Sequence, residues 1–197
     1  MTAYIVSCVV AGFLVGLTGI IPTVGLDRAI LVLLLVLVFG VGLDVGARGH
    51  GWDTIRALGP RLLAVPVASA LGSMLAIAMV AGFAWGYPWR EAFAFGSAFG
   101  WYTLSGPLMT HFAGAEAGAL AFLSDVIREL TAVVCIPLVA RFIGQAEAVA
   151  LGGATTMDTT FPILAEATDG RATPLAFAHG MILALLAPLL IPLWFSL

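Results

Sequence analysis

Charge is scarce in this chain of 197 residues, and lysine is missing from it altogether. Only 10% of the residues are charged, and the eight basic residues are all arginines. A soluble domain is usually about 25% charged and about 45–50% apolar, whereas this chain is 61% hydrophobic. A water-soluble fold of this size cannot bury so much apolar surface, so the composition excludes one. No basic stripe of the kind that binds nucleic acid is present either.

Sequence signals for cofactors, metals and covalent catalysis are also lacking. The two cysteines, Cys8 and Cys135, lie far apart inside apolar runs, which favours small buried side chains over a disulfide or a metal site. No glycine motif for a nucleotide and no metal-ligand spacing is found. Ser105 stands in Leu-Ser-Gly-Pro rather than in a nucleophile elbow. We therefore expect no enzyme, no cofactor and no metal, and any transport must be passive or driven by a gradient.

Long continuous apolar runs are what the chain does contain. In lipid every backbone polar group must be bonded within the chain, which leaves helices or a closed barrel. Barrel strands alternate in hydropathy over about ten residues, and the run at 29–41 does not. A spanning helix needs about 20 mostly apolar residues. The sequence predicts an all-α integral membrane protein with about five spanning helices, at roughly 3–21, 28–47, 60–85, 117–140 and 172–196.

Two further segments, 90–113 and 146–168, are long enough to cross but carry polar patches with glycine and proline, at 103–107 and 155–162. Proline removes a backbone donor and clashes with the preceding turn, so an unbroken helix is not expected at either patch. Broken backbone at membrane depth survives only when buried in protein or lining a wet cavity. We predict that both segments form broken, re-entrant hairpins that build the functional site.

The two broken segments belong to an internal repeat. A shift of 55 positions superposes two copies of Leu-Ala-Phe and two of Ile-Pro-Leu, and it places Pro107 on Pro162. Interrupted segments at corresponding positions of two repeats indicate a transporter binding site near the midplane. The expected division is a three-helix N-terminal part, a candidate scaffold or oligomerisation region, followed by a transport core of two repeats; the ranges are 1–89, then 90–141 and 146–197.

Arginine placement predicts the orientation, because short cytoplasmic loops carry an excess of basic residues. If each broken segment returns to the side from which it entered, the arginines that flank the spans divide into five inside and two outside. If the segments cross fully, the division is four to three. The re-entrant interpretation fits better, and it makes the repeats antiparallel, with the N-terminus in the cytoplasm.

Three charges fall inside the predicted span 117–140, at Asp125, Arg128 and Glu129. Charges at this depth are costly and indicate function. Asp125 and Glu129 share a helix face that Arg128 adjoins. One carboxylate can pair with the arginine, which leaves the other to bind a proton or a cationic substrate. The alternative is an internal ion-pair network that only fixes helix packing. We favour function for Glu129, as the deeper acid, and a partner role for Arg128.

Other polar candidates lie in the broken segments. Asp158, Thr156 and Thr159 combine a carboxylate and hydroxyls in the second one and could line a cation site or cap a half-helix. In the first, Ser105 and Trp101 could pack around a solute, although aromatic residues at this depth more often only pack.

Two candidates lie outside the broken segments. Asp44, near the end of the second span, is either intramembrane or an interfacial charge. His179, in the last span, is the type of residue that usually packs with a hydrogen bond.

Four ordered motifs resemble the lysine exporters known as LysO. The resemblance is clear from about residue 90 to the end, and its motifs are 100–106 (GWYTLSG), 128–130 (REL), 152–162 (GGATTMDTTFP) and 179–180 (HG). It implies export of L-lysine through the inner membrane, coupled to an ion gradient. It also implies that Glu129 and the two broken segments matter.

The resemblance also implies a partner. Typical members of that family carry about three additional N-terminal spanning helices, and this chain begins where their second part would. The missing helices would then come from a second copy of the chain, as a homodimer, or from a small separate membrane subunit. Asp44 would stand in for an acid of that region.

The sequence thus predicts a secondary transporter in the inner membrane that exports a cationic amino acid, with L-lysine expected, against protons or another ion. One alternative is a passive channel or an ion/proton antiporter. Another is a non-transporting membrane subunit that completes a partner transporter. Costly polar groups in the broken segments argue against the last, because a scaffold has no need of them.

Overall fold

The computed structural model describes residues 61–197 without a gap, and a few isolated positions before them (11, 14, 15, 18, 32, 33, 36, 39 and 59). The described part contains helices and no strand, as predicted. The predicted spans at 3–21 and 28–47 lie largely outside the described residues, and Asp44 lies outside them entirely.

Two described helices are long and apolar enough to cross a bilayer. They are α4 (Arg61–Phe83), over its stretch Leu62–Phe83, and α10 (Thr173–Ser196). These match the predicted spans at 60–85 and 172–196. The 28 residues of α7 (Ala115–Phe142) make a helix about 42 Å long, more than the hydrocarbon core of about 30 Å. Three charges in its middle distinguish it from the other two.

The first broken segment is interrupted earlier than proline placement predicts. Helix α5 (Trp89–Gly96) ends, the chain unwinds over 97–101, and α6 (Tyr102–Ala113) follows. In the break Phe99 and Gly100 have φ of 55° and 91°. The expectation of a break at 103–107 is wrong, because α6 continues through Pro107. The carbonyl that loses its donor to this proline is four residues back, so the lost hydrogen bond is confined to the start of α6 and the helix continues beyond it.

The second broken segment is interrupted where the sequence predicts. Helix α8 (Gln145–Gly152) gives way to a short 3₁₀ helix, η1 (Gly153–Met157), and then to α9 (Phe161–Ala167). Pro162 lies in the first turn of α9, where its missing N–H would have no helical partner in any case. Proline thus lies in the first turn of α9 but inside α6.

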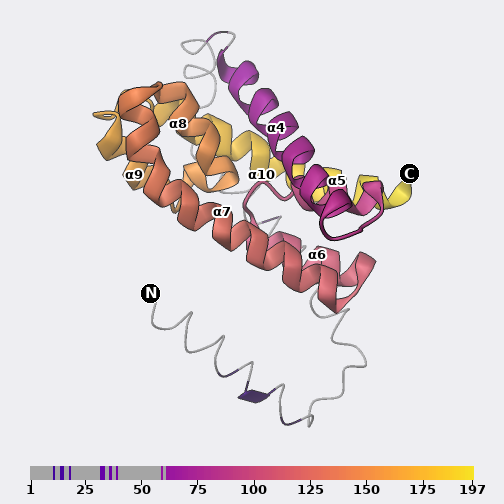
Figure 1. Ribbon diagram of the computed structural model, residues 1–197. Coiled ribbons are helices and arrows are strands. Elements are labelled where there is room, and N and C mark those ends of the chain that lie inside the picture. The colour runs from indigo at the N-terminus through magenta and orange to yellow at the C-terminus, as the bar shows by residue number, and fades with distance from the viewer. Residues whose placement is uncertain are drawn as a thin grey trace.

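The two halves of the described chain have the same order of elements. A short helix, a break, a second short helix and a long helix run from α5 to α7 and again from α8 to α10. In Figure 1, α7 and α10 run in opposite directions, with α5 and α6 at one end of the molecule and α8 and α9 at the other. The two breaks therefore approach each other between the ends.

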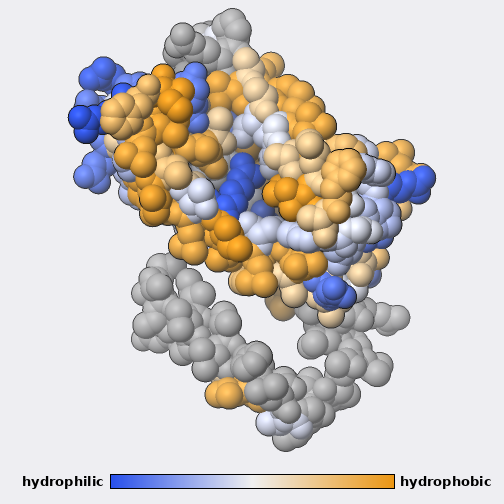
Figure 2. All heavy atoms as spheres, in the orientation of Figure 1, coloured by the Kyte–Doolittle hydropathy of each residue, from blue (hydrophilic) through white to orange (hydrophobic). Residues whose placement is uncertain are grey.

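The surface between the two ends is largely hydrophobic. Figure 2 shows hydrophilic residues gathered at the ends of the molecule and a further group in a hollow at the middle of this face, surrounded by hydrophobic atoms. On α7 exposed large apolar residues recur every three or four positions along one stripe, at Leu123, Ile127, Leu130, Val134 and Leu138, and Phe122, Val133 and Phe142 are exposed beside them. The inward face of the same helix carries Asp125 among small residues.

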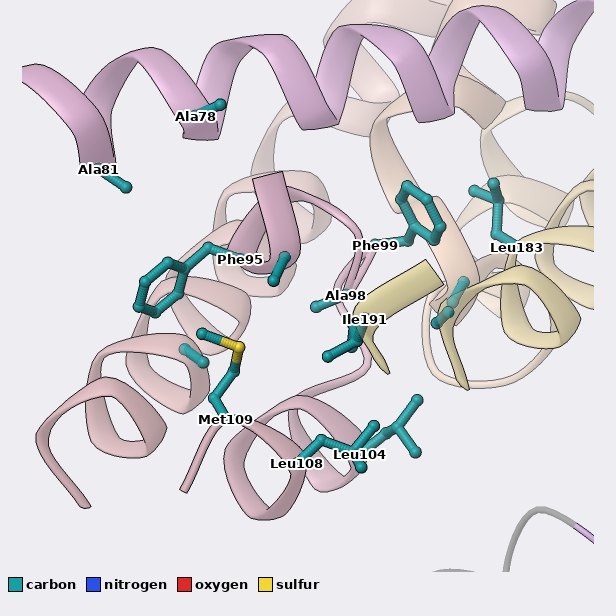
Figure 3. Packing of buried hydrophobic residues seen from close by; sticks show 14 of the residues in the cluster. Ala78, Ala81, Phe95, Ala98, Phe99, Leu104, Leu108, Met109, Leu183 and Ile191 are labelled. Carbon is teal, nitrogen blue, oxygen red and sulfur yellow. The ribbon is translucent and has the colours of Figure 1, made fainter. Parts of the chain in front are cut away.

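The main core lies between α4, α5, α6 and α10 and is built largely of small side chains. Figure 3 shows Phe95 and Met109 at one end of this cluster and Phe99 close to Leu183 at the other. Alanines such as Ala78 on α4 let the helices approach closely. Since Phe99 is fully buried here, the core fixes the first break in place.

Candidate functional site

The site begins where the two unwound stretches touch. The backbone N–H of Ala154 donates a hydrogen bond of 2.9 Å to the carbonyl oxygen of Phe99. Gly153 has φ of 63°, and a Cβ there would run into the same carbonyl oxygen. A Cβ on Gly100 would lie 3.9 Å from the carbonyl oxygen of Gly152. That distance is ordinary contact, so Gly153 is what lets the two stretches of backbone pass this close, and Gly100 is favoured by its positive φ.

Asp125 of α7 holds the first break. Its side chain, only 4% exposed, accepts one hydrogen bond from the backbone N–H of Gly100 (3.0 Å) and another from the hydroxyl of Ser105 (2.6 Å). The carboxylate thus joins the unwound stretch to the first turn of α6. Both predicted site residues are brought together, and the role their contacts indicate is positioning of the backbone.

Arg128 lies between the two breaks. Its Cδ would be 3.7 Å from a Cβ on Gly100, and one of its terminal nitrogens 2.8 Å from a Cβ on Gly153. The other terminal nitrogen donates a hydrogen bond of 3.0 Å to the hydroxyl of Ser73 on α4. No carboxylate lies within ion-pair distance of Arg128, since the only ion pair among the described residues joins Arg171 to Asp169, but Asp125 is near enough to act on the guanidinium electrostatically.

Helix α4 contributes two serines that sequence reasoning overlooked. The hydroxyl of Ser73 donates to the carbonyl oxygen of Gly96, at the end of α5 (3.0 Å). The hydroxyl of Ser69, one turn earlier, donates to the carbonyl oxygen of Ala150 near the end of α8 (2.9 Å). Carbonyls at a helix end lack intrahelical partners, so α4 satisfies one in each broken segment. The sequence feature that could have indicated these contacts is the pair of serines spaced i, i+4 in an otherwise apolar span, because serines in such spans often bond to a neighbouring helix.

A buried group of hydroxyls fills the second break. Thr155 and Thr160 lie 3.2 Å apart through their Oγ1 atoms, and the Thr156 hydroxyl donates to the carbonyl oxygen of Gly153 (2.9 Å). His179 Nδ1 lies 3.1 Å from Thr156 Oγ1. Because the threonine proton is already used, Nδ1 carries the proton of this bond. The histidine packs with a hydrogen bond as predicted, but its Nε2 is buried without a partner among the described residues.

Glu129 differs from Asp125 although the two share α7. It is half-buried and has no hydrogen-bond or ion-pair partner among the described residues. Asp125 is the acid more buried inside the protein, whereas Glu129 lies nearer the middle of the predicted span. Both Glu129 and Asp158 lie near enough to the ring of Tyr102 to act on its hydroxyl electrostatically. Two acids, one from α7 and one from the second break, thus flank the start of α6.

The remaining candidates take ordinary positions. Asp158 is exposed and accepts a hydrogen bond from the backbone N–H of Thr159, which is exposed too. It does not cap α9, whose N-cap is Thr160, without a side-chain capping bond. Trp101 is half-buried and packs against the main core. The described site thus holds three acids and one arginine, a net negative charge suited to a cation.

Almost the whole chain is similar in sequence to known proteins. A family model described as "Lysine exporter LysO" matches residues 6–195, so the similarity includes the part before residue 90. The chain is 37% identical to lysine exporter LysO of Escherichia coli over 183 residues, which cover 93% of this chain and 60% of that protein. It is 32% identical to a Haemophilus influenzae protein named "Putative lysine exporter", over 82% of this chain and 81% of that protein. No solved structure matches.

Proposed function

Since the chain belongs to the LysO family of lysine exporters, we propose that it exports a cationic amino acid, L-lysine, across the inner membrane at the expense of an ion gradient. The meeting of the two breaks carries this proposal. Two unwound stretches from opposite ends of the molecule touch beside α7, and acids outnumber basic residues around them. Unwound backbone with adjacent carboxylates is an arrangement by which transporters hold a cationic group.

Glu129 is the proposed ligand of the lysine side-chain ammonium. Asp125 has its oxygens committed to Gly100 and Ser105, whereas the Glu129 carboxylate has no partner within the described range. An unpaired carboxylate at membrane depth is costly, and either a proton or an ammonium group relieves that cost. Because the two would compete for one carboxylate, loading of lysine on one side and of a proton on the other couples export to proton entry.

The proposed movement is alternating access between two antiparallel repeats. Its support is the shared order of elements, the opposite directions of α7 and α10, and the position of one hairpin at each end of the molecule. In such folds one repeat rocks against the other around a fixed site. We propose that each broken segment re-enters the membrane from its own side.

The test is export of labelled lysine from proteoliposomes that contain the purified protein, with and without an imposed pH gradient. Glu129→Gln keeps the size of the side chain and removes its charge, so export should fall at least about tenfold, the effect of losing one charge-assisted contact. Glu166→Gln, the same change at an exposed acid of α9, should export like the wild type. Undiminished export by Glu129→Gln would refute the role of this acid.

The same assay distinguishes transport from passive leakage. A coupled exporter drives lysine against its own gradient when protons flow inward, whereas a passive channel only equalises concentrations. Lysine flux that is insensitive to the pH gradient, with no accumulation, would favour the channel.

A further inference from the structure

The guanidinium of Arg128 has no acid within ion-pair distance in the described region, and Asp125 acts on it only from farther away. Arginine has five N–H donors, and here one terminal nitrogen donates to Ser73 while no acid pairs with it. The nearest acid in sequence on the same face, Asp125, is occupied by Gly100 and Ser105. Arg128 therefore keeps free donors beside the two breaks.

The position of this guanidinium is fixed by its surroundings. Its stem runs past Gly100 and its end reaches Gly153, where the lack of a side chain makes room for the guanidinium. The Ser73 hydroxyl spends its own proton on the carbonyl of Gly96 and can only accept from Arg128. The arginine is thus aimed at the meeting point of the breaks, and Ser73 is a positioning residue.

A preset arginine with free donors suits a carboxylate. Its planar fork can make two parallel hydrogen bonds to the two oxygens, a geometry that an ammonium group cannot reproduce. Glu129, the next residue along α7, offers the opposite charge. One positive and one negative charge in the middle of α7 match a molecule that carries both a carboxylate and an ammonium group, and a diamine would leave the arginine without a partner.

We propose that Arg128 binds the α-carboxylate of the transported molecule and so restricts the substrate class to α-amino acids, excluding diamines and amino-acid amides. This inference rests on the proposed export function and assigns the residue that reads the carboxylate. The alternative is that Arg128 only stabilises the carbonyls of the unwound stretches.

The test compares binding of lysine and of lysinamide, which lacks the carboxylate charge, to the purified full-length protein in lipid nanodiscs. The titration is run at about pH 6, below the usual α-amino pKa, so that both compounds carry two ammonium groups. Wild type should bind lysine at least about tenfold more tightly, the value of a hydrogen-bonded charge pair. Arg128→Gln should bind lysine as weakly as lysinamide and leave lysinamide binding within about twofold. Arg171→Gln, at an exposed arginine, should preserve the wild-type ratio.

Several outcomes would overturn the assignment. If Arg128→Gln weakens both compounds equally, the arginine is structural. If wild type binds both compounds equally, the carboxylate is not read, while the export proposal stands; if it binds neither, both proposals fall. Should Arg128→Gln not fold, Arg128→Lys keeps the charge without the fork and should reduce the lysine-to-lysinamide ratio severalfold. An unchanged ratio in Arg128→Lys would contradict the proposal.

Discussion

Two acids one helical turn apart on α7 have different surroundings. The i, i+4 spacing places Asp125 and Glu129 on one face, and this much follows from the sequence. Which of them is occupied depends on Gly100 and Ser105, which come from other elements and meet only Asp125. Local periodicity holds no information about such long-range partners, so the sequence did not reveal that Asp125 is the acid whose oxygens are occupied.

We expect Asp125→Asn to destabilise the protein. The carboxylate accepts from two donors, and an amide can offer one oxygen only, so its NH₂ group would either oppose Gly100 N–H or deprive the Ser105 hydroxyl proton of its acceptor. An unsatisfied buried donor costs about 1–3 kcal/mol, which thermal unfolding in detergent would show as a lower midpoint.

The matched change on the same helix is Glu129→Gln. It removes a charge that has no described partner and is costly at membrane depth, so this variant should be at least as stable as the wild type. Equal stability of Asp125→Asn and wild type would contradict the positioning role of Asp125.

At the scale of elements, the two breaks show what proline predicts and what it does not. Pro162 starts α9 and marks its break correctly, whereas Pro107 lies inside α6 and the real interruption precedes it. What sets the first break is Gly100, at a φ that other residues rarely adopt, opposite Gly153. A glycine is common in membrane helices, so its need for positive φ was not visible from sequence alone.

The close crossing of the breaks is tested by Gly153→Ala with Gly170→Ala as its control. Both glycines have positive φ, so alanine at either costs about 1–2 kcal/mol of backbone strain. At Gly170 nothing lies within 4 Å of the added Cβ, but at Gly153 it meets the Phe99 carbonyl. We expect Gly153→Ala to be less stable by about 1–3 kcal/mol more than the control, in chemical unfolding, because the added atom overpacks the crossing.

We also expect the two glycine variants to differ in lysine export. Gly170→Ala should transport lysine normally, and Gly153→Ala should not, since the breaks would be pushed apart. Equal stability and export in the two variants would show that the crossing is not needed.

At the scale of the whole molecule, the apolar belt and the spanning helices at 60–85 and 172–196 follow from composition and run length. The connection between the halves does not. Ser69 and Ser73 place α4 against both broken segments, although α4 precedes the two repeats in sequence. Two hydroxyls in an apolar run do not specify which distant carbonyls they will meet, so this contact needed the structure.

The re-entrant arrangement makes a topological prediction. In a background with Cys8→Ser and Cys135→Ser, single cysteines replace Glu116 at the start of α7 and Asp169 after α9, both exposed. If each hairpin returns to its own side, a membrane-impermeant maleimide should label Glu116→Cys from the periplasm and Asp169→Cys from the cytoplasm. Labelling of both from the same side would mean that the broken segments cross the membrane fully.

The bond between Ala154 and Phe99 joins main-chain atoms only. Apart from a proline at position 154, which has no N–H to give, no exchange of side chains removes either of its partners. Most substitutions therefore leave the donor and the acceptor of this hydrogen bond in place, although a larger side chain nearby can still push the two stretches apart. Relatives could vary the residues around it, and with them the solute that is accepted, while the same two points of the chain stay fastened together.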